Sequence, residues 1–292
     1  MSWRIVVVKN SSKLDFKMDY MVIRQSDDIK KIHLSEIHTL ILESTAVSIT
    51  AVLLCELVKR KIKVIFCDEK RNPISELSFL YGSHDTSDKI RKQIAWNDNA
   101  KKAVWTEIVK EKIKNQSLIL QKYGLNKEKE TLANYVNEVG FGDCTNREGH
   151  AAKVYFNALF GFDFTRNLEE PINHALDYGY TILLSTFNRE ITLKGYLTQL
   201  GLFHNNMFNQ FNLSSDLMEP FRVLVDDTVK QLNPQKLETE EKKHLINILN
   251  KDVIINGKTN ILSNAIKIYC SSIFNAMETG DLSQIRFCEY EL

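Results

Sequence analysis

The chain has 292 residues, of which 43% are hydrophobic, so it can bury a sizeable core and exceeds the usual size of one domain. Its 38 basic and 37 acidic residues leave a formal charge of +1, which excludes a polyelectrolyte and restricts any nucleic-acid surface to one region. The five cysteines form no C-x-x-C pair, which argues against a zinc knuckle or a disulfide framework.

Residues 1–83 are predicted to form a small β-rich domain, because apolar residues alternate with polar ones or occur in short β-branched runs. The predicted strands are Trp3–Val8, Leu14–Lys17, Tyr20–Arg24, Lys31–Leu34, Thr39–Leu42, Lys63–Phe66 and Ile74–Leu80. One helical segment, Ser48–Lys61, interrupts them. The polar stretch from Gly82 to Asp88 predicts a linker, and the second domain then covers residues 84–292.

The second domain is predicted to be larger and all-α, so the fold class is α+β. Helical spacing extends over residues 88–139, a further helix starts near residue 145, and buried helices over 173–200 lead directly into His204. Further along, Asn256-Gly257 predicts a hairpin turn, and Ser263 is expected to cap a closing helix that ends near Met277.

The first helical region is locally basic. Residues 88–130 contain 11 basic and six acidic side chains, an excess of five positive charges. The helical spacing predicts the pairs Asp88–Lys92, Asp98–Lys102, Glu107–Lys110 and Glu111–Lys114, and it leaves Lys89, Arg91, Lys101 and Lys112 without an obvious partner. Two interpretations stay open, a solvated helix face and a surface that contacts phosphates.

The stretch 201–222 brings one imidazole and two carboxylates close together in apolar, amide-rich surroundings. Asp216 and Glu219 are three residues apart, a spacing that predicts one shared helix face, where a divalent cation or a buried proton would offset their repulsion. In the alternative interpretation His204 is a hydrogen-bonded core residue, and the acids favour a helix start capped by Ser214 or Ser215 and restarted at Pro220.

Glu148 stands early in the helix that is predicted near residue 145. A glutamate there commonly favours the helix dipole. However, Glu148 precedes Ala151, Ala152 and Tyr155 on the face that should turn inward, so its carboxylate is expected to enter the core. His150 lies mostly on another side of this helix, and we assign it a structural role.

Several motifs, in order along nearly the whole chain, resemble one family. They are VSITAVLLCELVKRKIKVIFCD, Arg147-Glu148-Gly149, NHALDYGY, LGLFHNN and DLMEPFR. Together they resemble the CRISPR-associated integrase of spacer acquisition. The short DLMEPFR form and the chain length resemble the type II version, which is found beside single-effector bacterial systems.

This resemblance implies the same two-domain fold and assigns a metal site. By motif, Glu148, His204 and Glu219 match the metal ligands of the family, and Asp216 matches an additional acid, so all four are implied as catalytic. Two carboxylates and one imidazole suit Mg²⁺ or Mn²⁺, which prefer oxygen donors.

The implied activity is metal-dependent transesterification that joins the 3′-hydroxyl ends of prespacer DNA to a CRISPR repeat. The implied partners are double-stranded DNA, a second copy of the chain, a small ferredoxin-like CRISPR adaptation protein and other CRISPR effector components. We expect a cytoplasmic protein without membrane contact, because the sequence shows no signal peptide and no run of ~18 apolar residues.

Two other functions stay open. One is a metal-dependent endonuclease or branched-DNA resolvase that uses water as the nucleophile. The other is a non-catalytic DNA-binding scaffold whose acidic cluster holds a structural ion. Three ligands on separate segments favour catalysis, because they leave coordination positions open, whereas a structural ion is normally enclosed.

Overall fold

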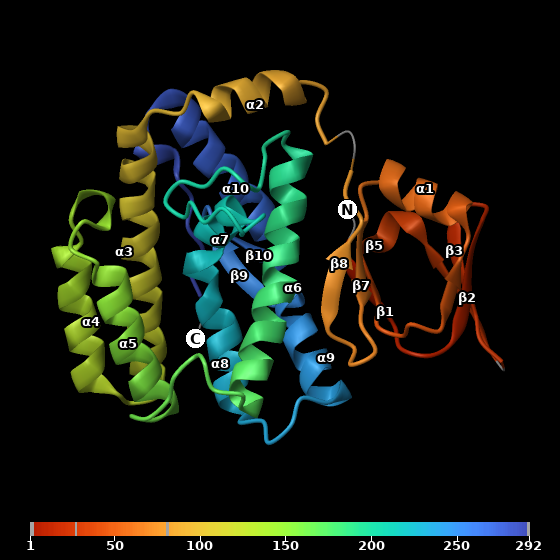
Figure 1. Ribbon diagram of the computed structural model, residues 1–292, viewed down its shortest axis with the longest axis horizontal. Helices are drawn as coiled ribbons and strands as arrows, with labels where there is room; N and C mark the ends of the chain where they lie inside the picture. Colours follow the sequence, from red (N-terminus) through yellow and green to blue (C-terminus); the bar gives the residue numbers. More distant parts are fainter. Residues whose placement is uncertain (1–2, 27, 80–81, 291–292) are drawn as a thin grey trace. The chain divides into compact units, whose positions relative to one another are not determined.

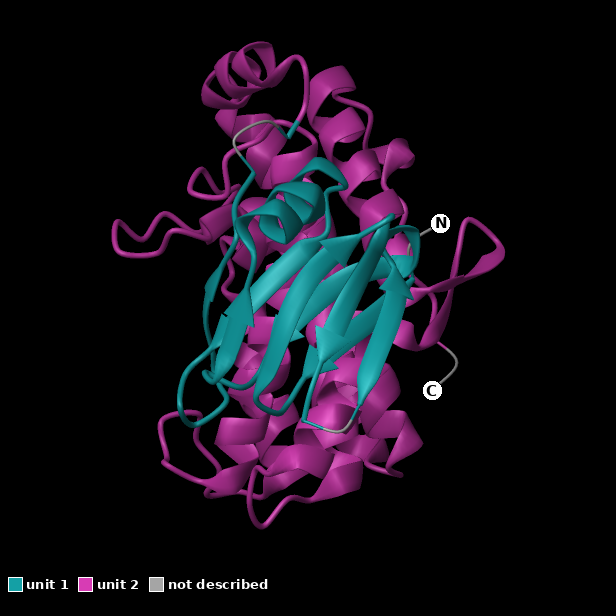
Figure 2. Cartoon of the chain, turned by 90° about the vertical axis from the view of Figure 1, so that its right-hand side faces the viewer, with its two compact units in different colours: residues 1–82 teal, residues 83–292 magenta. Residues whose placement is uncertain are grey.

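The computed structural model describes residues 3–26, 28–79 and 82–290. The chain divides into two compact units, Met1–Gly82 and Ser83–Leu292 (Figure 2). The predicted boundary, between residues 83 and 84, lies one residue beyond this division. Strands dominate the first unit and helices the second, which confirms the predicted α+β fold class (Figure 1).

The first unit contains two four-stranded sheets. In the first sheet, the order is β1 (Arg4–Val8), β5 (Ile37–Leu42), β7 (Lys63–Cys67) and β8 (Pro73–Glu76), with only β8 antiparallel to its neighbour. In the second sheet, the order is β4 (Ile29–His33), β3 (Tyr20–Arg24), β2 (Ser12–Lys17) and β6 (Val47–Ile49), with only β6 parallel to its neighbour. Helix α1 (Ala51–Lys59) follows β6.

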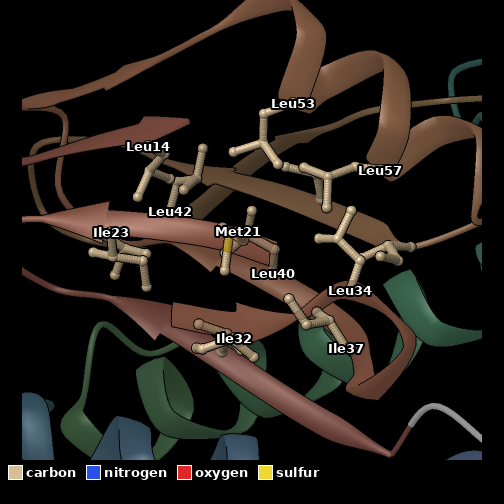
Figure 3. Packing of buried hydrophobic residues seen from close by; sticks show 14 residues of the cluster. Leu14, Met21, Ile23, Ile32, Leu34, Ile37, Leu40, Leu42, Leu53 and Leu57 are labelled. Carbon is tan, nitrogen blue, oxygen red and sulfur yellow. The ribbon is translucent and has the colours of Figure 1, made fainter. Parts of the chain in front are cut away.

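The core of this unit lies between the sheets and α1 (Figure 3). Its central members include Leu14 and Met21 from one sheet, Leu40 from the other and Leu53 from the helix, all fully buried. Every residue of β5 is buried, as is typical of a parallel strand covered on both faces.

The predicted strands correspond to β1–β5, β7 and β8, and the prediction missed β6. This short strand overlaps the start of the predicted helix Ser48–Lys61. The helix begins only at Ala51, because the side chain of Thr50 accepts the backbone N–H of Leu53 and caps it there. The end of the predicted strand Ile74–Leu80 lies partly outside the described residues, and β8 ends at Glu76.

The second unit is mostly helical. Its helices are α2 (Thr86–Ile94), α3 (Asp98–Lys122), α4 (Asn126–Glu138), α5 (Arg147–Phe160), α6 (Pro171–Leu193), α7 (Asn212–Met218), α8 (Arg222–Leu232), α9 (Thr239–Asn247) and α10 (Leu262–Thr279). One hairpin, β9 (Asp252–Ile255) and β10 (Lys258–Ile261), turns at Asn256-Gly257, where φ is 54° and 67°. The prediction of an all-α domain therefore needs this correction, although the turn itself was predicted.

Helix α3 is central to the second unit. It lies between α4 and α5 on one side and α7 and α8 on the other, and it packs against all four (Figure 1). Most of its residues from Val104 to Leu120 are buried. Side chains on this one helix can therefore reach both α5 and the segment that joins α7 to α8.

Two predicted helix boundaries in this unit are wrong. Helix α6 ends at Leu193, and an irregular segment, 194–211, separates it from α7, so no helix leads directly into His204. Helix α10 begins at Leu262, so Ser263 lies inside the helix and does not cap it. Within the described ranges, no helix combines the length and the hydropathy of a membrane span.

Candidate functional site

Glu148 lies in the first turn of α5, and an acid before the helix fixes that turn. The carboxylate of Asp143 accepts the backbone N–H groups of Arg147 at 2.8 Å and of Glu148 at 3.1 Å. Asp143 thus satisfies two N–H groups that the helix start leaves free. The side chain of Glu148 is only 30% exposed, on the side of the helix that buries Ala151 and Tyr155.

Lys112 of α3 connects Glu148 with Glu219. Its ammonium contacts Oε1 of Glu148 and lies 2.5 Å from Oε2 of Glu219, and its side chain is only 8% exposed. The other oxygen of Glu219 accepts a hydrogen bond from Nε of Arg222 at 3.0 Å. Two of the predicted metal ligands therefore meet at one buried lysine.

The charges in this cluster stabilise one another. Burial acts to raise the pKa of Glu219, but Arg222 and Lys112 outweigh it and lower that pKa to about 2. Burial acts to lower the pKa of Lys112, but the charges of Glu219 and Glu148 outweigh it and raise that pKa. At neutral pH, Glu219 is therefore an anion and Lys112 a cation.

Oε2 of Glu219 lies beside the positive charge of Lys112. Oε2 of Glu219 is buried and, among the described residues, accepts no hydrogen bond, although the Nζ of Lys112 is 2.5 Å away. At this distance Lys112 is the charge partner of Oε2 and helps to lower the pKa of Glu219. An ionised carboxylate has about four lone-pair sites, so Glu219 can still bind a further ligand.

His204 is held by Asp216. Its Nδ1–H donates to Oδ1 of Asp216 at 2.5 Å, and its side chain is 41% exposed, whereas that of Asp216 is fully buried. This hydrogen bond raises the pKa of His204 and outweighs the opposing effect of burial. Because Nδ1 faces Asp216, Nε2 is the nitrogen that remains for a ligand.

The carboxylate of Asp216 also organises the loop that carries His204. It accepts the backbone N–H groups of Leu202 at 2.6 Å, Phe203 at 3.0 Å and His204 at 3.2 Å. A Cβ at Gly201 would lie 2.7 Å from Oδ2 of Asp216 and 2.4 Å from the carbonyl oxygen of His204, so a glycine permits this close approach. Both oxygens of Asp216 are thus engaged within the protein.

Asp216 and Glu219 do not lie in one continuous α-helix, although their spacing predicted a shared helix face. Helix α7 ends at Met218, and Glu219 and Pro220 begin a 3-10 helix that leads into α8. Asp216 is stabilised by backbone N–H groups and His204, whereas Glu219 is stabilised by two cations. A new helical segment begins at Glu219 and Pro220, close to the restart at Pro220 in the alternative interpretation.

The cap that the alternative interpretation placed at Ser214 or Ser215 is not present. Phe211 occupies the N-cap position, and neither Ser214 nor Ser215 caps the helix. His150 is exposed and contacts Arg147, with Nδ1 and Nη1 3.4 Å apart. It is not among the residues that pair with Lys112.

Helix α3 supports the site at two further points. The ring of Trp105 stacks on Phe203, with centroids 4.7 Å apart and planes 3° apart, and meets the edge of His204 at 5.8 Å. The side-chain amide of Asn115 donates to the carbonyl oxygen of Pro220 at 3.1 Å. These contacts fix the His204 loop and the Glu219 turn against the helix that carries Lys112.

The sequence reasoning did not identify Lys112 as a site residue, although a signal was present. Lys112 follows Trp105 by seven residues and Ile108 by four, so it lies on the apolar face of its helix. A lysine on such a face is rarely buried without an acidic partner. The position of Lys112 on this face therefore predicts an acid opposite it.

Three of the four basic residues that were predicted to lack a partner have one. Lys89 pairs with Glu278 at 2.5 Å, Lys101 with Asp98 at 2.6 Å, and Lys112 with the two glutamates. The predicted pair Asp98–Lys102 is therefore replaced by a pair one residue closer. The predicted pairs Asp88–Lys92, Glu107–Lys110 and Glu111–Lys114 are present.

The predicted ligands fit a divalent cation in part. Among residues 3–26, 28–79 and 82–290, no three His, Cys, Asp or Glu side chains already form a metal-binding group. Glu148 and Glu219 nevertheless converge on one positive charge, and Oε2 of Glu219 lacks a hydrogen bond. His204 is close enough for Glu219 and Glu148 to raise its pKa. This donor set suits Mg²⁺ or Mn²⁺ better than a thiophilic metal.

Comparisons with known proteins agree over most of the chain. The family model described as CRISPR associated protein Cas1 matches residues 5–259. A CRISPR-associated endonuclease Cas1 from Neisseria meningitidis serogroup C is 36% identical over 261 residues, which cover 87% of this chain and 86% of the relative. A second protein of that name, from Francisella tularensis subsp. novicida, is 26% identical and covers 87% and 89%.

Solved structures share the fold. A casposase bound to integration product has a TM-score of 0.77 at 16% identity and covers 97% of this chain and 92% of its own. A CAS1 protein from Thermotoga maritima has a TM-score of 0.76 at 17% identity, with 94% and 97% covered. A chain of a Cas6-RT-Cas1–Cas2 complex has a TM-score of 0.74 at 21% identity, and the match covers 97% of this chain and 36% of the other.

Proposed function

This chain belongs to the family of the CRISPR-associated protein Cas1, and from that premise we propose that it joins DNA 3′-hydroxyl ends to a CRISPR repeat by metal-dependent transesterification. The family alone makes it an enzyme of the endonuclease and integrase class in CRISPR adaptation. We propose three further details: the nucleophile is a DNA 3′-hydroxyl, the cofactor is a divalent metal ion, and the reaction joins DNA strands.

The observation that carries the proposal is the convergence of Glu148 and Glu219 on one buried point beside an oriented imidazole. These two carboxylates and Nε2 of His204 would hold Mg²⁺ or Mn²⁺. Such an ion lowers the pKa of a hydroxyl nucleophile and neutralises the charge that develops on the attacked phosphodiester.

The other residues of the site position these groups. Arg222 donates a hydrogen bond to Oε1 of Glu219 and lowers the pKa of that carboxyl, so Glu219 stays ionised. Asp216 orients His204 and the loop around it. Asp143 fixes the helix turn that carries Glu148. The chain therefore supplies a prearranged set of donors, and strand transfer requires little further covalent chemistry from the protein.

The proposal extends to the form and the partners of the enzyme. We infer the type II form, a homodimer, and assembly with a small ferredoxin-like adaptation protein on double-stranded DNA. The 36% identity to the Neisseria relative supports the first inference, and structural neighbours described as Cas1–Cas2 complexes support the assembly.

The second candidate function is DNA hydrolysis, which the relatives' name of endonuclease favours. The same site could direct water instead of a 3′-hydroxyl. A non-catalytic scaffold is less well supported, because Glu148, His204 and Glu219 stand on three separate segments, and such a donor set leaves coordination positions open.

The experiment that separates these functions uses two donors. Short duplex DNA with free 3′-hydroxyls and the same duplex with 3′-deoxy ends are each incubated with a supercoiled plasmid that contains a CRISPR repeat, the small partner protein and Mn²⁺. Donor and target are labelled separately. We expect a covalent donor–target product only with the free 3′-hydroxyl. If target cleavage were equal with both donors and no joined product formed, the hydrolase would be the correct function.

A further inference from the structure

We propose that Lys112 competes with the divalent cation for Glu148 and Glu219, so that the lysine holds the site together before the ion binds and weakens the binding of that ion. This inference rests on the proposed function, because it concerns the same metal site. It assigns to Lys112 the role of a positioning residue that sets how readily the ion enters.

Lys112 is buried and depends on its two acidic partners. An ammonium that is 8% exposed loses most of its hydration, and it is stable there only because two carboxylates contact it. The reverse also holds. Two carboxylates that converge on one point repel each other. Lys112 contacts both glutamates, so it offsets this repulsion and holds them close together.

Each oxygen of Glu219 already faces a cation, Oε1 the guanidinium of Arg222 and Oε2 the ammonium of Lys112. An ion that binds Glu148 and Glu219 together would approach them where Lys112 contacts both. Mg²⁺ binds oxygen ligands at about 2.0–2.1 Å. It would therefore stand within a few ångströms of the ammonium, and two cations at that separation repel. The ion and the ammonium cannot both occupy this position.

The helix around Lys112 is fixed, because Asn115 binds Pro220 and Trp105 stacks on Phe203. The lysine side chain itself has four flexible carbons. Entry of the ion therefore requires only that the ammonium leave one or both carboxylates, while the glutamates and the backbone keep their places.

Lys122 on the same helix provides a matched control. Its ammonium lies 2.9 Å from Oδ1 of Asp227, and Asp227 also accepts hydrogen bonds from Tyr123 at 2.9 Å and Gln231 at 3.0 Å. This pair contains one carboxylate, and its acid has other donors. Removing Lys122, which is more exposed than Lys112, deletes the ion pair of one buried acid and leaves no two converging carboxylates without a cation.

The test compares the full-length wild-type protein with the Lys112→Met and Lys122→Met variants. Mn²⁺ binding is measured by calorimetry, and the melting temperature is measured in EDTA and in saturating Mn²⁺. We expect Lys112→Met to bind Mn²⁺ about 10-fold to 100-fold more tightly, because a charge-assisted contact no longer has to be broken. Its melting temperature should fall in EDTA and rise more than that of the wild type when Mn²⁺ is added. Lys122→Met should melt lower in both conditions, with unchanged Mn²⁺ affinity.

The outcomes distinguish the inference from the proposed function. If the wild type binds Mn²⁺ and Lys112→Met binds it equally or more weakly, the competition is wrong while the metal site stands. If neither protein binds Mn²⁺, the proposed metal site fails. Should Lys112→Met not fold in EDTA, the proposal requires that Mn²⁺ restore its fold, and a failure to do so overturns it. Lys112→Arg, which keeps the charge, should fold in EDTA and bind Mn²⁺ no more tightly than the wild type.

Discussion

Helix α3 contains two lysines that neutralise buried carboxylates, and the two clusters differ in how completely their acids are satisfied. Lys122 pairs with Asp227, whose oxygens also accept hydrogen bonds from Tyr123 and Gln231. Lys112 pairs with two glutamates, and Oε2 of Glu219 accepts no hydrogen bond among the described residues. The first cluster needs no further ligand, whereas the second has an acceptor to spare.

A third buried acid shows what the cations contribute. Asp226, the neighbour of Asp227 on α8, accepts a hydrogen bond from Tyr180. Burial raises the pKa of Asp226 to about 6, although Tyr180 opposes the shift. Glu219 is equally buried, but Arg222 and Lys112 lower its pKa to about 2. Arg222 and Arg166 also oppose the shift of Asp226, but they do not outweigh its burial, whereas Lys112 and Arg222 contact Glu219 directly and do.

The largest expected effect comes from breaking the open cluster. Glu148→Gln keeps the size of the side chain but removes one charged donor, and we expect strand transfer to fall about 10³-fold, as for the loss of ~4 kcal/mol of transition-state stabilisation. Asp227→Asn should lower the melting temperature and leave joining per folded molecule within about twofold. Joining of labelled donor to plasmid measures the first effect, and thermal unfolding measures the second. Wild-type joining by Glu148→Gln at all Mn²⁺ concentrations would rule out the ligand assignment.

The second prediction uses Asp226 and the pH. Because the pKa of Asp226 is about 6 in the folded state and 3.8 in the reference state, the folded protein keeps a proton that the unfolded chain loses. The resulting stabilisation is complete below pH 3.8 and is lost as the pH rises to about 6. Asp226→Asn stays neutral at every pH. From pH 4 to pH 7, its free energy of unfolding should therefore rise by about 2–3 kcal/mol relative to that of the wild type.

Urea unfolding of both proteins at these two pH values measures the gain. The asparagine can still accept the hydrogen bond of Tyr180, so the comparison isolates the charge. An unchanged stability difference across the range would show that Asp226 is ionised in the folded protein throughout.

The architecture could be predicted because local patterns decide it. Alternating apolar residues identify β2 and β3, and Asn256-Gly257 identifies a hairpin whose turn requires positive φ. Helix ends were predicted less well. Helix α6 ends at Leu193, and an irregular segment follows it in the sequence. In that segment, the backbone N–H of Leu197 donates to the side chain of Gln93, more than 100 residues away. Such long-range contacts leave no local signal.

The residues of the site could be predicted from the sequence, but which of them contact one another could not. Motif resemblance pointed to Glu148, His204, Asp216 and Glu219, and the structure brings the glutamates to Lys112 and the aspartate to His204. Spacing alone suggested that Asp216 and Glu219 act together. It could not show that the helix ends between them or that a lysine 36 residues before Glu148 lies opposite.

The third prediction concerns the link between Asp216 and His204. Asp216→Asn would direct an amide at the backbone N–H groups that now bind a carboxylate, so the His204 loop should loosen. We expect strand transfer to fall about 10-fold to 100-fold, as is typical when a supporting partner of a metal ligand is removed. NMR titration should also show a lower pKa for His204, because the hydrogen bond that raises it is weakened. An unchanged pKa would mean that Asp216 serves stability alone.

The smallest expected effect concerns basic residues outside these clusters. Arg91 and Lys102 are exposed on α2 and α3, whereas Lys101 pairs with Asp98 at 2.6 Å. If the exposed pair contacts the DNA backbone, neutralising both should weaken binding to all sequences alike and reduce the salt dependence by roughly one unit of slope per lost contact. Lys101→Gln, the matched control, should change the slope less, because its charge is already balanced. Fluorescence anisotropy of labelled duplex across a salt series measures the slopes. Equal slopes for all variants would show that this helical surface is only solvated, and that DNA is held elsewhere on the protein.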